Sequence, residues 1–216
     1  MVMDNTQRMI ALLGRIRKQM NGAVAESMGT HGVNYGLNYG VSIATLREIV
    51  AQESKDYDFA KYLYRQQVRE LKLCACHLAD PAKLDTHEFP FWSRGITNAE
   101  LAEELAFALL SKIYDINSLM GVWTTESNEL VAYAALMAAS RNARTTSEVA
   151  FIAAEKSVKA NPTSEYIAQG VVSLLCHIAQ HDKSVPIGIP SLLESMPDSP
   201  TKRRIAEELD WRLNFL

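Results

Sequence analysis

The sequence predicts an all-α protein made of short amphipathic helices stacked in antiparallel pairs. Apolar residues recur at three- and four-residue spacing along most of the chain, which is typical of helices with one buried face. Valine and isoleucine follow the same spacing, and no segment shows a convincing strand pattern. Helices this short cannot bury an apolar face alone, so we expect them to stack within one domain spanning residues 1–216.

The N-terminal forty residues combine a basic helix with a glycine-rich segment. A helix is predicted over residues 4–20, with an inward face of Met9, Leu12, Leu13 and Ile16. Arg8, Arg15, Arg17 and Lys18 make this end of the chain locally basic. Residues 21–40 are rich in glycine and asparagine, which favours a loop containing about one helical turn.

Residues 40–84 form the clearest repeating unit. Ser42 follows a glycine and precedes an apolar-periodic run, as an N-cap residue should. A second short helix begins near Asp56 and Asp58. The third is predicted from Arg65 to Asp80, ended by Pro81, and its buried stripe comprises Val68, Leu71, Ala75 and Leu78.

The rest of the chain continues the helical pattern. Phe89, Phe91 and Trp92 surround Pro90 and predict an aromatic anchor on a short helix. Asn98 can cap the next strong helix. The helices predicted for this part of the chain span residues 98–113, 117–123, 126–144, 147–160, 164–181 and 201–215, with a short one near 191–195 in a proline-interrupted segment.

Composition is ordinary for a soluble globular protein, and it limits the class of partner. The 216 residues are 48% hydrophobic and 22% charged, with a net charge of -3. This balance excludes a uniformly basic protein but allows a local basic stripe. Three cysteines form no disulfide framework and suit a reducing compartment. With no apolar run of about 20 residues, we expect a cytoplasmic protein without membrane association.

The common catalytic signatures are absent from the sequence. It contains no P-loop, no G-x-G-x-x-G, no G-x-S-x-G and no H-E-x-x-H. His177 and His181 lie four residues apart beside Cys176, but nothing else completes a ligand set. We therefore expect no metal and no small-molecule cofactor.

Two clusters of charge admit alternative interpretations. Glu100, Glu103 and Glu104 crowd one helix start, where a solvated acidic face at the positive helix end is the simpler reading. Arg65, Arg69 and Lys72 share one face of their helix. They form either a solvated face paired with acidic neighbours or a contact surface for phosphates.

Several of these segments resemble the AlkD-like family of alkylpurine DNA glycosylases built from HEAT-like repeats. The resemblance is carried by GVSIATLREIV, by Asp58-Phe59-Ala60 and by VRELKLCACHLADPAKL, with support from MNGAVAESMGTHGVNYGLNYGV. It covers roughly residues 7 to 181 and is clearest over 7–120. It implies a single curved solenoid whose concave basic surface holds duplex DNA.

The resemblance also implies a site, from which this chain departs. In the family a carboxylate and two tryptophans face a cationic alkylated base. The pattern W-D-x-x-D aligns with A-E-L-A-E, which makes Glu103 the expected catalytic carboxylate and replaces the first tryptophan by Ala99. The second tryptophan falls near Ser173, and an arginine that grips the DNA backbone falls near Ala132 or Tyr133.

Three functional hypotheses follow. The first is a DNA-binding family member in which excision of N3- or N7-alkylated purines is weak or lost. Its expected DNA contacts are Arg65, Arg69, Lys72, Arg15 and Lys18. The second is a working glycosylase that uses Glu103 in a rearranged pocket. The third is a HEAT-repeat scaffold that binds a protein partner and no nucleic acid.

Overall fold

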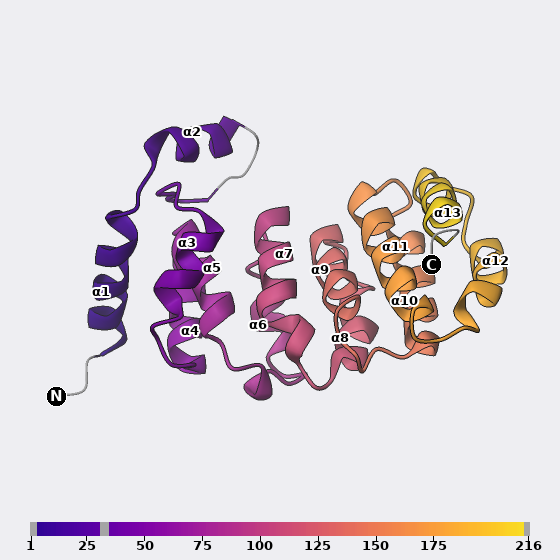
Figure 1. Cartoon of the computed structure of the whole chain (residues 1–216), viewed down its shortest axis with the longest axis horizontal. Coiled ribbons are helices and arrows are strands. Elements are labelled where there is room, and N and C mark those ends of the chain that lie inside the picture. The colour runs from indigo at the N-terminus through magenta and orange to yellow at the C-terminus, as the bar shows by residue number, and fades with distance from the viewer. Residues whose placement is uncertain (1–3, 31–34, 214–216) are drawn as a thin grey trace. The chain divides into compact units, whose positions relative to one another are not determined.

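The described part of the chain is mainly helical and divides into two compact units. The computed structural model describes residues 4–30 and 35–213. Unit 1 is Met1–Lys83 and unit 2 is Leu84–Leu216 (Figure 1). Within the described residues there is no strand, and one isolated parallel bridge joins Leu37 to Val68. The all-α prediction is confirmed.

In unit 1, helix α5 occupies the centre. Both α3 and α4 pack on α5, and α1 packs on α3 and α4. The helices of this unit are α1 Asn5–Arg17, α2 Gly22–Thr30, α3 Ile43–Val50, α4 Tyr57–Tyr64 and α5 Arg69–Leu78, followed by the 3-10 turn η1 Pro81–Lys83. Every α5 residue except His77 is buried, which makes this helix the core of the unit.

Local side-chain caps fix where the helices of unit 1 begin. The Asp4 carboxylate caps α1, and the Ser42 hydroxyl accepts a hydrogen bond from the Thr45 amide at the start of α3. Asp56 accepts one from the Phe59 amide at 3.0 Å and so begins α4. Such caps satisfy amides that have no partner within the helix, and the predicted starts of α3 and α4 are confirmed.

Two sequence predictions for unit 1 need correction. Residues 22–30 form a nine-residue helix, α2, and not the loop with one turn expected from the glycine content. Helix α5 begins at Arg69, four residues later than predicted, because Arg65 ends α4 and Val68 pairs with Leu37 in extended conformation. Residues 31–34 of the predicted loop lie outside the described residues.

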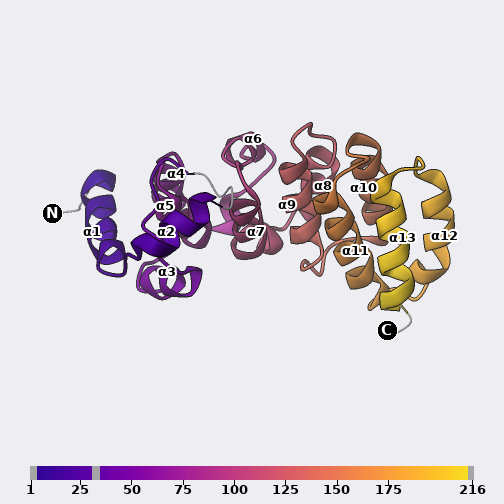
Figure 2. The same cartoon turned by 90° about the horizontal axis from the view of Figure 1, so that it is seen from above.

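Unit 2 consists of two layers of helices. In one layer α7, α9, α11 and α13 pack side by side, and in the other α8, α10 and α12 follow one another (Figure 2). The bounds are α6 Phe89–Ser93, α7 Ala99–Ala108, η2 Leu110–Lys112, α8 Ile116–Trp123, α9 Glu129–Ala139, α10 Ser147–Ala160, α11 Glu165–Ala179, α12 Val185–Ser195 and α13 Pro200–Leu213.

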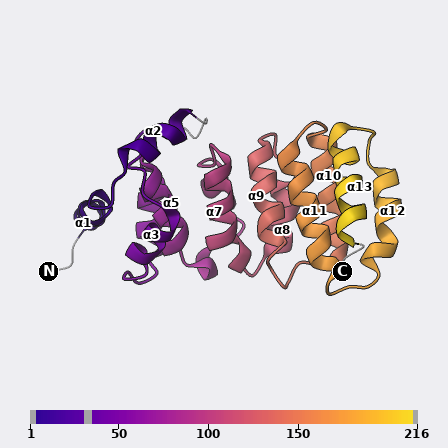
Figure 3. The same ribbon diagram turned by 45° about the horizontal axis from the view of Figure 1, so that its top comes forward.

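Close packing in the first layer of unit 2 depends on small residues. Val131 to Ser140 are all buried, and half of these ten are alanine. A Cβ at Gly170 of α11 would lie 3.0 Å from the Leu136 Cβ of α9, so a side chain there would push the two helices apart. Figure 3 shows α9 and α11 lying side by side.

The aromatic anchor predicted around Pro90 is confirmed as the short helix α6. Phe89 and Trp92 are both buried, and the Phe89 ring meets the edge of the Trp123 ring at 6.3 Å between centroids. Helix α12 is longer than the predicted 191–195. Its first proline lies at the helix start, where no amide hydrogen is needed, and the helix continues through Pro190 in its interior. The last predicted residues of α13 lie outside the described residues.

Candidate functional site

Glu103 and Tyr133 form the centre of the candidate site in unit 2. The Asn98 side chain caps α7 through the Leu101 amide at 3.0 Å, which sets the helix phase and places Glu103 on the side of α9. There the Tyr133 hydroxyl donates a hydrogen bond of 2.7 Å to Oε1 of Glu103. The Tyr133 side chain is buried, whereas Glu103 is half-buried.

The Tyr133 phenol is held in its protonated form. Burial raises its pKa well above the ordinary value, and the hydrogen bond and negative charge of Glu103 raise it further. Because a protonated phenol can donate, Tyr133 keeps its hydrogen bond to Oε1 of Glu103.

A second tyrosine extends the site to a third helix. The Tyr166 ring of α11 lies 5.2 Å from the Tyr133 ring, centroid to centroid, and Tyr166 is 38% exposed. One carboxylate and two phenol rings are therefore brought together from α7, α9 and α11. Tyr133 occupies a position where the resemblance placed an arginine. The sequence reasoning missed the pair, although a tyrosine inside the alanine-rich run of α9 was an available signal.

A cavity of about 490 Å³ opens beside Tyr166. It lies between the start of α11 and one face of α13. Arg204 donates to Glu165 at 2.7 Å and to Glu208 at 3.3 Å, and Arg212 donates to the other oxygen of Glu208 at 3.2 Å. The positive charges at this edge of the cavity are therefore already paired with glutamates.

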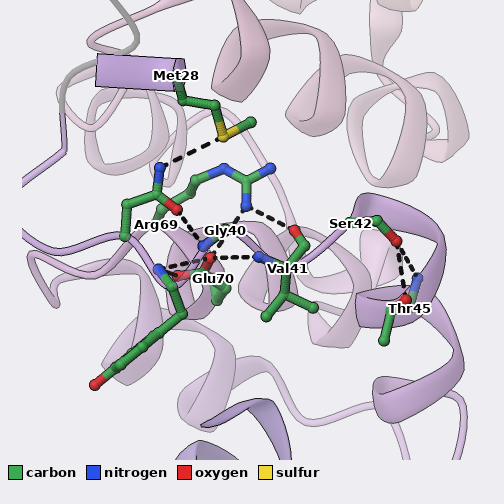
Figure 4. A network of polar contacts seen from close by, with 9 residues as sticks. Met28, Gly40, Val41, Ser42, Thr45, Arg69 and Glu70 are labelled. Atoms are coloured by element: carbon green, nitrogen blue, oxygen red, sulfur yellow. Dashed lines mark hydrogen bonds and ion pairs between the residues drawn. The ribbon is translucent and has the colours of Figure 1, made fainter. Parts of the chain in front are cut away.

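The basic stripe predicted on α5 is not a surface. Arg69 is 1% exposed, so the expectation that it faces solvent is wrong. Its guanidinium donates to the Val41 carbonyl at 2.8 Å and to Glu70 at 3.1 Å. Glu70 in turn accepts hydrogen bonds from the backbone amides of Tyr39 and Val41 (Figure 4). This buried pair ties residues 39–41 to the central helix.

Lys72 is also buried, with 6% of its surface exposed. Its ammonium donates to the Tyr64 carbonyl at 2.8 Å and lies 4.8 Å from the centre of the Tyr64 ring. Burial lowers the pKa of this ammonium, the direction expected when a cation loses water. The prediction that Lys72 is exposed is therefore wrong, as it is for Arg69. In both cases the reason is that neighbouring helices and extended chain cover α5.

The remaining predicted DNA contacts differ in their surroundings. Arg15 is half-buried and paired with Glu53, while Lys18 at the end of α1 and Arg65 at the end of α4 are exposed. The structure therefore brings Lys18 and Arg65, but not Arg69 or Lys72, to the surface of unit 1. None of these residues shares a unit with Glu103.

Charge is divided unequally between the units. Unit 1 has eleven lysines and arginines against eight aspartates and glutamates, a net charge of +3. Unit 2 has the same number of basic residues against seventeen acidic ones, a net charge of -6. The overall value of -3 hides this difference.

The histidine pair lies elsewhere in unit 2. The rings of His177 and His181 are 5.3 Å apart beside a cavity of about 250 Å³. Within residues 4–30 and 35–213, no three histidines, cysteines or carboxylates are grouped so that they could hold a metal ion. None of the helices described is long and apolar enough to cross a bilayer.

Comparison with known proteins decides the family. The sequence model described as DNA alkylation repair enzyme matches residues 12–185. The chain belongs to this family. The matched range includes Lys18, Glu103, Tyr133 and Tyr166, whereas α13 and its arginines lie beyond it. A search of curated proteins finds no match.

A solved structure supports the fold of this DNA alkylation repair family member. It is described as "a new family of proteins related to the HEAT-like repeat DNA glycosylases with affinity for branched DNA structures". The match has a TM-score of 0.68 and covers 97% of this chain and 95% of the other, at 17% sequence identity. The helix stack is therefore a HEAT-like repeat fold.

Proposed function

We propose that this member of the DNA alkylation repair family binds DNA through unit 1 and does not release alkylated purines. The observation that carries the binding part is the net charge of +3 on unit 1, against -6 on unit 2. Phosphates dominate the free energy of DNA binding, so the positive unit is the one that attracts the duplex. The affinity for branched DNA of the similar solved structure supports DNA with a junction as the ligand.

Lys18 and Arg65 are the proposed phosphate contacts. Both side chains are exposed at helix ends of unit 1. Arg15 has a supporting place, since its ion pair with Glu53 holds α1 beside the chain that follows α3.

The loss of excision rests on the surroundings of Glu103. Release of a cationic base needs aromatic faces that attract the positive charge and a carboxylate that stabilises charge developing in the transition state. Here Ala99 and Ser173 stand where the resemblance places tryptophans, and the Glu103 carboxylate is engaged by Tyr133. The exposed Tyr166 supplies a single accessible ring.

Salt-dependent binding tests the DNA proposal. The double variant Lys18→Ala/Arg65→Ala should weaken binding to every DNA probe alike. It should also flatten the slope of log affinity against log salt by about 0.9 for each lost phosphate contact. The matched control is Arg94→Ala/Lys183→Ala, which removes two exposed cations from unit 2 and should change neither quantity. Equal effects of the two double variants would contradict the proposal.

Base release tests the second part. Duplex DNA containing N3- and N7-methylated purines is incubated with the wild-type protein and with Glu103→Gln, and free base is measured. We expect no release above background from either. Release by the wild type that disappears in Glu103→Gln would instead establish a glycosylase that uses Glu103.

The alternative function is a protein scaffold without nucleic-acid binding. It predicts that the wild-type protein binds neither plain, damaged nor branched DNA at low salt. The same titration therefore separates the two functions.

A further inference from the structure

Helix α2 contributes nothing to the core of unit 1. None of its nine residues is buried, and its one charged residue is Glu26. Val24 within the helix is 40% exposed, and Met20 just before it is 62% exposed. A helix of nine residues is not stable in water by itself, so α2 must be held in place by its attachment to the rest of unit 1.

That attachment is a network of polar contacts leading to the buried Glu70. The Asn21 amide donates to the Tyr39 carbonyl at 2.8 Å, and the Asn21 side chain accepts a hydrogen bond from the Val24 amide at 3.2 Å. The Glu70 carboxylate accepts a hydrogen bond from the Tyr39 amide at 3.1 Å. The chain from Tyr39 thus links the start of α2 to the central helix.

The far half of α2 is attached as well. The Asn38 side chain donates to the Met28 sulfur at 3.4 Å and accepts from the Gly40 amide at 2.8 Å (Figure 4). Gly40 has a φ of +70°, and a Cβ there would come within 2.0 Å of the Asn21 carbonyl oxygen. Only glycine lets the backbone at residue 40 approach the backbone of Asn21 this closely. The fold therefore fixes an exposed apolar helix at both of its ends.

Cations lie next to this helix in sequence. Arg17 and Lys18 end α1, three and two residues before Met20, and the whole unit carries a net charge of +3. A surface with cations beside apolar side chains is suited to nucleic acid. Phosphates attract the cations, and unstacked bases offer an apolar face to the other side chains. A stable protein interface buries about 800 Å² on each partner, far more than two apolar side chains provide. A wedge at a DNA kink needs only one or two such side chains.

We propose that α2 is the element that recognises DNA junctions, with Met20 and Val24 against unstacked bases at the branch point. Lys18 contacts a neighbouring phosphate. The proposal rests on the DNA binding proposed above and adds to it the residues that distinguish a junction from a continuous duplex. In a continuous duplex the bases are stacked and offer Met20 and Val24 no apolar face.

The test uses a four-way junction and a linear duplex of the same length and base composition. The variant Met20→Gln/Val24→Thr keeps the size of both exposed side chains and removes their apolar character. We expect its affinity for the junction to fall about tenfold and its affinity for the linear duplex to stay unchanged. The matched control is Ile187→Gln/Val122→Thr, two exposed apolar residues of unit 2 that are 80% and 47% exposed. It should bind both probes like the wild type.

A fluorescent base reports the contact directly. With 2-aminopurine at the branch point, binding of the wild type should raise the fluorescence, and binding of the Met20→Gln/Val24→Thr variant at saturation should not. Junction binding by this variant that equals the wild type overturns the inference, as does an equal loss for both probes. The inference is also overturned if light scattering shows that the wild type self-associates and that the variant does not, while the variant keeps its affinity for the junction. If the wild type and the variant bind both probes equally well, only the role of α2 is refuted. If the wild type binds no DNA at all, the proposed function is refuted too.

Discussion

Helices α5 and α9 occupy equivalent places in the two units, and they are built from different residues. Each is covered by neighbours on all sides, with nine buried residues in each helix. Helix α9 is apolar on every face, as expected for a fully buried helix. Helix α5 instead buries Arg69, Glu70 and Lys72. Its charges are tolerated because each finds a partner, among them the Val41 and Tyr64 carbonyls.

The difference shows what each unit does with its charged groups. Unit 1 uses Arg69 and Glu70 internally to fix the extended chain that supports α2, and Lys72 to bind the end of α4. Unit 2 keeps an alanine-rich centre that draws α11 close, and it presents its notable carboxylate, Glu103, at a partly exposed site. A basic stripe on a helix is therefore evidence for a nucleic-acid surface only when some face of that helix remains open.

The largest expected effect comes from breaking the buried pair of α5. Arg69→Leu should lower the free energy of unfolding by about 3–5 kcal/mol, because the buried Glu70 side chain then loses its cationic partner. Denaturant unfolding followed by circular dichroism measures the loss. Arg65→Leu, which changes an exposed arginine four residues earlier in the sequence, is the control and should change stability by about 0.5 kcal/mol or less. Similar losses for both variants would remove the distinction between an interior and a surface cation.

Apolar packing should be equally important in both central helices. Leu71→Ala in α5 and Leu136→Ala in α9 each truncate a buried leucine and should each cost about 2–5 kcal/mol. Thermal and denaturant unfolding measure both. Ile10→Ala, at a position 61% exposed, is the control, with an expected change within about 0.5 kcal/mol. If Leu71→Ala behaves like the control, the helix phase of α5 is wrong.

The site of unit 2 should be less costly to disturb than the interior of unit 1. Tyr133→Phe removes the hydroxyl that binds Glu103 and should cost about 1 kcal/mol, because the half-buried carboxylate can take water instead. Unfolding measurements on Tyr133→Phe and on the exposed Tyr166→Phe provide the comparison, with almost no change expected for the latter. A loss as large as that of Arg69→Leu would mean that Glu103 is structurally as critical as Glu70.

The smallest effect is a pH dependence confined to unit 1. Burial lowers the pKa of Lys72 in the folded state below its ordinary 10.5, so the unfolded chain binds more protons between the two values. The contribution of Lys72 therefore makes the wild type more stable as the pH rises through this window towards 10.5. The variant Lys72→Met lacks the group and should lack that rise. Unfolding curves measured for both proteins across the alkaline range test this, and parallel profiles would argue that Lys72 is hydrated in the folded protein.

Much of the fold could be predicted from local signals. The caps Ser42, Asp56 and Asn98 begin α3, α4 and α7 where the sequence indicated, since a cap and the amides it satisfies lie within a few residues. Leu71, Ala75 and Leu78 of the predicted stripe are buried in α5, whereas Val68 precedes the helix and is only half-buried. The aromatic anchor at Pro90 follows from composition in the same way. The family also followed from short motifs, and the match over residues 12–185 confirms it.

The sequence by itself determined the helical class, most helix starts and the family. Tertiary structure alone decided that Arg69 and Lys72 are internal, that Tyr133 engages Glu103, and that residues 22–30 form a helix without a buried side. The reason is the range of the interactions. A cap or an apolar period acts between residues a few positions apart, whereas the burial of a cation depends on distant groups, such as the Val41 carbonyl 28 residues before Arg69. Periodicity shows that the faces of a helix differ, and only the packed chain shows which of them are covered.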